Sequence, residues 1–148
     1  RYLLIRYSMA RFYILLGKYE ASLTVLEDIF QLKQIDLRED LQLFAQCLAL
    51  IAHYDLGNHL YIESELRNYR RRIRNKGVLY DLEDLLTHYL QRLNTSTEEK
   101  KPSIFKAFEQ SIQALITKNP SLKDVLSETF DILRWIKSKE QGLVMYKI

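Results

Sequence analysis

The chain has 148 residues, of which 47% are hydrophobic and 28% are charged, and its formal net charge is +3 at pH 7. This composition is typical of one soluble globular domain, and it excludes a fibrous or a wholly disordered chain. Charged residues or glutamines interrupt every apolar stretch before it reaches the ~18 residues of a membrane span. No signal-peptide pattern opens the sequence, so we expect a cytoplasmic protein.

Apolar residues recur at steps of three and four through most of the chain, which is the pattern of amphipathic helices. Only 4 glycines and 2 prolines occur, too few for a turn-rich all-β domain. The pattern predicts an all-α fold of about seven helices, joined mostly by short connections and therefore antiparallel to their neighbours. The first five are expected at residues 2–16, 18–33, 36–56, 59–75 and 78–93.

The organisation follows from the breaks in this pattern. We expect a single domain, residues 1–148, with repeat-like helices in 1–93 and a polar loop at 94–102. A pair of helices separated by Asn119-Pro120 is expected in 103–140, and residues 141–148 form a tail.

The first helix is apolar almost all round. We therefore expect some of Tyr2, Ile5, Met9 and Phe12 to lack packing partners within this chain. Because the sequence opens with Arg1 already in helical pattern, we expect a fragment of a longer protein. A homodimer formed through this apolar helix is an alternative explanation for the same residues.

Gly17 and Gly57 each separate two helical segments, and they lie 40 residues apart (57 − 17), a spacing typical of two-helix repeats. The first of these turns resembles that of a tetratricopeptide repeat. In this resemblance Gly17 is the turn glycine, Tyr19 is the aromatic residue after it, and Ser22 and Ala10 are the small residues that let the two helices approach.

The second copy of this turn is weaker, because His59 replaces the tyrosine and Ile62 replaces the small residue. The resemblance covers residues 3–75, although the period of about 40 exceeds the family's 34. It implies antiparallel helix-turn-helix repeats stacked into a short right-handed α-solenoid. It also implies that a protein or peptide binds in the concave groove lined by the first helix of each pair.

Polar residues remain on the first helix of each pair once the apolar stripes are assigned. Several are neutral hydrogen-bonding side chains that suit a peptide backbone. Solvent-facing residues need no function, so this pattern also fits a plain surface. The candidate groove residues are Ser8, Arg11, Gln42, Gln46, His53, Asp84, His88 and Gln91.

Basic residues gather between Arg67 and Lys76, and Arg67, Arg70, Arg71 and Arg74 fall on one side of the expected fourth helix. Cations near a helix C-terminus gain from the helix dipole, but like charges four residues apart repel by a similar amount. Three interpretations follow: a solvated face, a contact with an acidic protein, or a nucleic-acid surface. The net charge of only +3 disfavours the third.

Residue types that carry chemistry are scarce. Cys47 is the only cysteine, and its apolar neighbours predict a buried position. His53, His59 and His88 do not have the spacing of a zinc site. No phosphate-binding loop, nucleophile elbow or dinucleotide fingerprint occurs. We therefore predict no metal, no cofactor and no enzymatic activity.

The sequence favours a non-catalytic scaffold that binds a protein or peptide, which is what the resemblance implies. An alternative is a ligand-sensing regulatory domain of a larger nucleic-acid-binding or catalytic protein. Direct binding of nucleic acid through the Arg67–Lys76 face is the third hypothesis.

Overall fold

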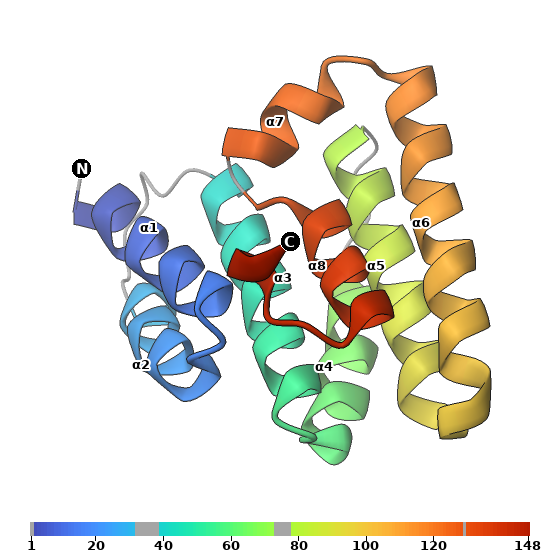
Figure 1. The fold of residues 1–148 in the computed structure, drawn as a ribbon. Coiled ribbons are helices and arrows are strands. Elements are labelled where there is room, and N and C mark those ends of the chain that lie inside the picture. Colours follow the sequence, from blue (N-terminus) through green and yellow to red (C-terminus); the bar gives the residue numbers. More distant parts are fainter. Residues whose placement is uncertain (1, 32–38, 73–77, 129) are drawn as a thin grey trace.

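The computed structural model describes residues 2–31, 39–72, 78–128 and 130–148 (Figure 1). In this part of the chain every regular element is a helix, which confirms the predicted all-α fold class. The α-helices are α1 (Tyr2–Leu15), α2 (Tyr19–Phe30), α3 (Glu39–Asp55), α4 (His59–Arg72), α5 (Val78–Thr95), α6 (Lys101–Lys118), α7 (Leu122–Glu128) and α8 (Ile132–Gln141). Two short 3₁₀ helices are η1 (Glu98–Lys100) and η2 (Met145–Lys147).

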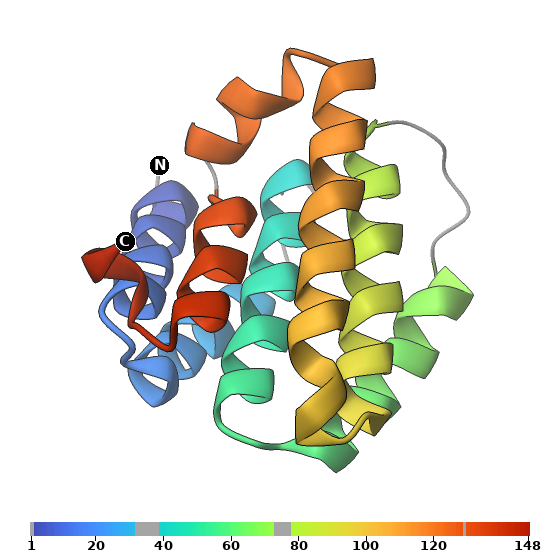
Figure 2. The same ribbon diagram turned by 45° about the vertical axis from the view of Figure 1, so that its right-hand side comes forward.

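Helix α3 stands in the middle of the molecule. The α1–α2 pair lies on one side of it and the α5–α6 pair on the other, while α4 packs behind (Figures 1 and 2). Helix α7 crosses the top from α6 towards the α1 side, and α8 then returns along α6. The C-terminal η2 returns to the α1 side of the molecule and contacts that helix.

The turns after α1 and α3 have the same hydrogen-bond pattern. Gly17 N–H donates to Ile14 O at 3.0 Å, and Gly57 N–H donates to Tyr54 O at 3.0 Å. Both glycines have positive φ, +76° and +80°, a conformation that residues with a Cβ adopt only with strain. Two equivalent glycine turns therefore end the first helix of each pair, 40 residues apart in the sequence.

The α1–α2 pair is closely packed because small residues face each other. Ala10 and Ser22 are completely buried, and Ser22 Oγ donates to the carbonyl oxygen of Ala10 at 2.8 Å. In the α3–α4 pair, Ile62 occupies the place of Ser22 and is also completely buried. A small residue in the first pair is thus replaced by a large one in the second.

Helix α3 is packed on two sides. Ala45, Ala49 and Ala52 are buried, and so is Cys47, which confirms the burial expected for that cysteine. Contacts come from α1, α2, α4 and α5. The start predicted for this helix, at residue 36, lies outside the described residues.

The connection between α5 and α6 is shorter than the polar loop predicted at 94–102. Helix α5 continues to Thr95, η1 follows, and α6 begins at Lys101 with Pro102 in its first turn. Thr95 Oγ1 donates to Gln91 O at 3.0 Å, so a residue that looks loop-like in the sequence satisfies its hydroxyl inside a helix. Proline is equally compatible with a helix start, because its missing N–H would be unpaired there.

The last predicted helix is two helices, so the described chain has eight α-helices instead of the seven expected. Helix α8 starts anew because Asp131 caps it: its side chain accepts from Arg134 N at 3.1 Å. The predicted tail at 141–148 contains η2, and Met145 in it is buried. Arg134 Nε donates to Met145 O at 2.9 Å and ties this segment to α8.

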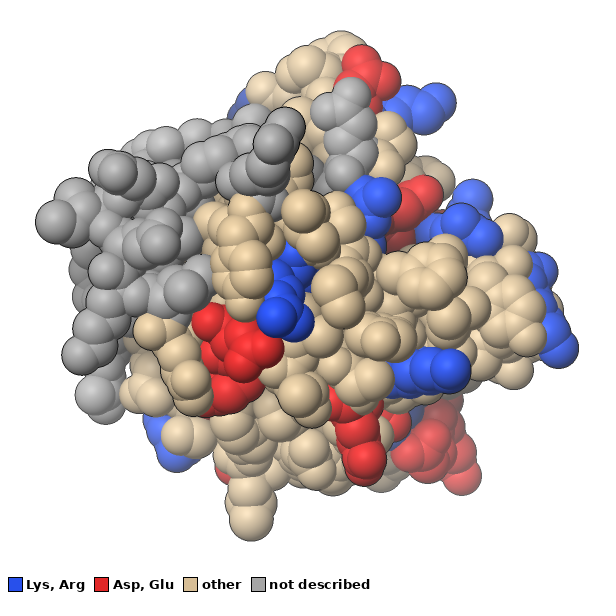
Figure 3. Space-filling model, turned by 90° about the vertical axis from the view of Figure 1, so that its left-hand side faces the viewer, with Lys and Arg blue, Asp and Glu red and all other residues tan. Residues whose placement is uncertain are grey.

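The outer face of α1 is apolar and exposed. Tyr2, Ile5, Met9 and Phe12 are all at least 37% exposed, so these apolar side chains are not buried in the core. Figure 3 views the side of the molecule on which α1 and α2 lie; its described surface is largely uncharged, with charged side chains in small separate groups. Within the described residues, no helix combines the length and the apolar character that crossing a membrane requires.

Candidate functional site

A groove crosses α3 between the end of α2 and the start of α4. It has a volume of about 410 Å³. We call it the α3 groove. The described residues that line it are Phe30, Gln42, Gln46, Ala49, Leu50, Tyr61 and Glu65.

The α3 groove combines an apolar floor with aromatic sides. Ala49 and Leu50 are buried beneath it, whereas Phe30 of α2 and Tyr61 of α4 are 41% and 42% exposed. Two large rings left in contact with water beside a concave surface are typical of sites that take up an apolar side chain. Ala49 has a small side chain, so it leaves most of the groove empty.

His53 and Asn58 hold Tyr61 in place. The His53 and Tyr61 rings are stacked, with centroids 3.7 Å apart and planes inclined by 27°. Asn58 Nδ2 lies 2.9 Å from His53 Nδ1, and an amide nitrogen can only donate, so Nδ1 is the acceptor. Burial lowers the pKa of His53, which keeps this ring neutral at pH 7.

The charges beside the α3 groove are negative. Glu65 is a half-buried member of the lining, and the structure shows no partner for its carboxylate among the described residues. Burial, together with the charges of Glu65 and Glu27, raises the pKa of the Tyr61 hydroxyl. None of the described lining residues is a lysine or an arginine.

The structure places the eight predicted groove residues at several positions. Gln42 and Gln46 lie together in the α3 groove, and His53 stands behind Tyr61. Ser8 and Arg11 line a different cavity, of about 270 Å³, with residues of the α7–α8 segment and η2. The α5 residues, Asp84, His88 and Gln91, are exposed and line neither of these cavities in the described chain.

The predicted arginine face falls largely outside the described residues. Arg67 is exposed on α4. Arg70 and Arg71 belong to the same helix, but their side chains are not among the described ones, and Arg74 lies outside the described residues altogether. The acidic-partner and nucleic-acid hypotheses for this face stay predictions.

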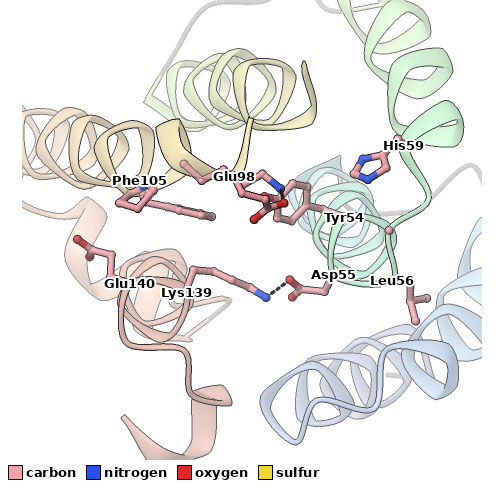
Figure 4. A pocket seen from close by; sticks show the side chains of 11 residues that line it. Tyr54, Asp55, Leu56, His59, Glu98, Phe105, Lys139 and Glu140 are labelled. Atoms are coloured by element: carbon pink, nitrogen blue, oxygen red, sulfur yellow. Dashed lines mark hydrogen bonds and ion pairs between the residues drawn. The ribbon is translucent and has the colours of Figure 1, made fainter. Parts of the chain in front are cut away.

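Asp55, which the sequence did not single out, connects the end of α3 to α8 (Figure 4). Its side chain is 1% exposed and forms an ion pair with Lys139. Trp135 Nε1 donates to Asp55 Oδ2 at 3.0 Å. Burial, followed by the charge of Asp55 and a hydrogen bond to it, raises the pKa of Tyr19, so α2 reaches the same carboxylate.

A cavity of about 630 Å³ opens beside this cluster, between the end of α3 and α6 (Figure 4). Two ion pairs line it, Lys139 with Asp55 and Lys101 Nζ with Glu98 Oε1 at 2.6 Å, and Glu140 also belongs to the lining. Burial, with the charges of Asp55 and Glu98, raises the pKa of Tyr54 to about 12. These pairings connect α3 to α8 and η1 to α6.

One buried acid has no partner. Glu83 of α5 is completely buried, and within the described part of the chain neither of its carboxylate oxygens has a hydrogen-bond partner. Burial and the charge of Asp84 raise its pKa to about 9, so it is protonated at pH 7. Burial, with a contribution from the charge of Glu83, raises the pKa of the Cys47 thiol well above its usual value.

The described residues contain no group of three or more histidine, cysteine, aspartate or glutamate side chains placed to hold a metal ion. Comparison with known protein families, with curated proteins and with solved structures gave no match for this chain. The site therefore has to be interpreted from its own geometry.

Sequence reasoning found the two glutamines of the α3 groove but missed its sides. Phe30 and Tyr61 looked like ordinary apolar positions of their helices. Their exposure depends on how far apart α2 and α4 lie in space, and the sequence of either helix alone does not predict that separation. The signal for Asp55 was available in the sequence, since this charged residue stands directly before Leu56-Gly57, at the position where the α1–α2 pair has Leu15.

Proposed function

We propose that the protein is a non-catalytic module that binds a peptide or a peptide-like segment of another protein in the α3 groove. The two helical pairs, α1–α2 and α3–α4, act in this proposal as degenerate repeats of a short right-handed α-solenoid related to tetratricopeptide repeats. The observation that carries it is the α3 groove itself, which joins two exposed rings, two glutamine amides and an apolar floor.

The contacts after each glycine support the repeat part of the proposal. Tyr19 and His59 stand two residues after Gly17 and Gly57. Tyr19 contacts Asp55 near the end of α3, and His59 Nδ1 hydrogen-bonds to Asn94 near the end of α5. Each turn thus contacts the end of the first helix of the following pair, which is how stacked repeats join their neighbours.

The test is binding of random twelve-residue peptides selected on the full chain by phage display, measured afterwards by fluorescence anisotropy. Tyr61→Ala removes one side of the α3 groove, and we expect it to weaken binding of the selected peptides about tenfold or more. Tyr146→Ala is the matched control, because Tyr146 is a similarly exposed tyrosine in η2. Equal binding to the two variants would show that the groove is not the binding site.

A second candidate function is self-association through the apolar face of α1. Leu4, Ile5, Met9 and Phe12 together line a shallow depression on that helix. Sedimentation velocity of the wild type and of Phe12→Ser tests it, with Leu60→Ser as the control, since Leu60 is 83% exposed on α4. A wild type that stays monomeric at every concentration would exclude this candidate.

A further inference from the structure

The chemistry of the α3 groove also specifies its ligand. We propose that the occupant is an extended peptide segment in which a lysine or arginine lies next to an apolar side chain. This inference rests on the binding function proposed above and adds the class of partner. It depends on three features of the groove, namely its rings, its amides and the negative charge of Glu65, for which the described residues supply no cation.

The apolar side chain is specified by the space between Phe30 and Tyr61. The rings stand on two different helices, and the buried Ala49 and Leu50 form the surface between them. A leucine, methionine or aromatic side chain placed there would cover both rings and remove them from water. The stack of Tyr61 on His53 fixes one side of this space before any ligand arrives, which lowers the entropy cost of binding.

The extended backbone is specified by Gln42 and Gln46. These residues are four apart on α3, so their side chains leave the helix about 6 Å from each other. Residues two apart in an extended chain repeat every ~6.6 Å, and each glutamine amide carries both a donor and an acceptor. Both side chains are half-buried in the lining, and within the described chain no hydrogen bond engages either amide.

The basic residue is specified by Glu65 and Glu27. Glu65 is half-buried on α4 and has no cationic partner among the described residues, while Glu27 stands on α2. The charges of both residues raise the pKa of the Tyr61 hydroxyl, and Glu65 itself belongs to the lining of the groove. A ligand cation beside Tyr61 would pair with Glu65 without first breaking an existing ion pair.

An acidic ligand is disfavoured by the same charges. An acidic peptide, a phosphate group or a nucleic-acid backbone would bring negative charge next to Glu65 and Glu27 without a described cation in the lining to receive it. Like charges placed together across an interface are a strong element of specificity. Arg67, the described residue of the arginine face, follows Glu65 by two residues and therefore lies on a different side of α4.

Three peptide pools test the proposal on the full chain by fluorescence anisotropy. Each pool fixes one leucine or phenylalanine and varies its neighbours: lysine and arginine in the first, glutamine and serine in the second, aspartate and glutamate in the third. We expect the first pool to bind about tenfold more tightly than the second at low salt. The advantage should shrink as the salt concentration rises.

Glu65→Gln should reduce the advantage of the basic pool to about twofold or less, and Glu65→Lys should transfer it to the acidic pool. Glu63→Gln is the matched control, because Glu63 is exposed on α4 but faces away from Glu65. Circular dichroism of each variant checks that the helices are intact, and the conservative glutamine variant gives the answer if the lysine variant does not fold.

The outcomes separate this inference from the function on which it rests. Equal affinity for the basic and neutral pools, with binding still lost in Tyr61→Ala, would overturn the charge preference and leave peptide binding in the groove intact. A preference for the acidic pool in the wild type would also overturn it. Failure of all three pools and of the random library to bind would overturn both the inference and the proposed function.

Discussion

The two helical pairs, α1–α2 and α3–α4, have connecting turns of the same geometry, but their helices are packed through different residues. Their glycine turns have matching φ values and matching hydrogen bonds. Beyond the turn, Ser22 lets α2 approach α1 closely, whereas the equivalent buried residue between α3 and α4 is the larger Ile62. The glycine sets the direction of the second helix, and the residue five positions later controls how closely that helix packs.

The difference between the pairs is also where the candidate site arises. The α3 groove lies between α2 and α4, over the helix that both of them flank. In the first pair the equivalent region of α1 carries the exposed apolar residues Ile5, Met9 and Phe12, whereas the second pair has the buried Ala45, Ala49 and Ala52. The same helix position is therefore an outer surface in one pair and a packed interior in the other.

The largest expected effect comes from the position before each glycine turn. Leu15 of the first pair packs against the core, but its equivalent, Asp55, holds Trp135 and Lys139. Asp55→Ala would leave the Trp135 N–H and the Lys139 ammonium without their buried partner. We expect it to lower the free energy of unfolding by about 3–5 kcal/mol, measured by urea denaturation.

Asp28→Ala is the control for this variant. Asp28 pairs with Arg6 at 3.6 Å on the surface of the α1–α2 pair, with its side chain 48% exposed. An exposed pair contributes less than about 1 kcal/mol, so this change should be nearly neutral. Equal losses in the two variants would mean that the Asp55 cluster does not connect the second pair to α8.

Ser22→Ile would give the first pair the large residue of the second. The added side chain has to enter a completely buried position, and the hydrogen bond to Ala10 O is lost. Overpacking costs about 1–3 kcal/mol and the hydrogen bond about 1 kcal/mol, so we expect a loss of about 2–4 kcal/mol. Ser103→Ile, at an exposed serine of α6, is the control, and a stable Ser22→Ile variant would show that the small residue does not control the spacing.

Much of the fold could be predicted because a helix produces a pattern of apolar residues within its own short stretch of sequence. The spacing of apolar residues located α1 to α6, and the glycines located two turns. The split between α7 and α8 was missed because Asp131 acts as a cap only when the chain around it leaves the helix. The short link before α6 was missed because Thr95 looks loop-like but bonds back to its own helix.

The candidate site could be predicted only in part, for a physical reason. Gln42 and Gln46 were identified because polar residues on an otherwise apolar helix are visible in the sequence. Phe30, Tyr61 and Glu65 come from two other helices, and only the three-dimensional gap between those helices brings them to the glutamines. Glu83 was likewise hidden, since an acid in an amphipathic helix is ordinarily assigned to the solvated side.

The burial of Glu83 in α5, the helix that follows the α3–α4 pair, can be tested through the pH dependence of the free energy of unfolding. Its pKa is raised from 4.5 to about 9 in the folded protein. Below pH 4.5 the group is protonated in both states. As the pH rises towards 9 only the unfolded chain ionises, so stability falls by about 1.4 kcal/mol per pH unit from this group.

Glu83→Gln should remove this dependence and raise the free energy of unfolding at pH 7 by about 1–3 kcal/mol, because a neutral amide replaces an acid that must hold its proton. Urea denaturation at pH 5 and pH 8 measures it, with the exposed Asp81→Asn as the control. A variant whose stability falls with pH as steeply as that of the wild type would show that Glu83 is not the buried acid responsible.

The smallest expected effect distinguishes the two turns themselves. Gly17→Ala and Gly57→Ala each place a Cβ at positive φ, which costs about 1–2 kcal/mol. At Gly57 nothing else lies within 4 Å of the new atom, but at Gly17 it would stand 3.3 Å from Val144 Cγ1. Gly17→Ala should therefore cost more, and adding Val144→Ala should cancel the excess in a double-mutant cycle of thermal unfolding. The cycle gives zero coupling if the C-terminal segment does not pack on the first turn, and in that case the two turns would be equivalent in energy as well as in geometry.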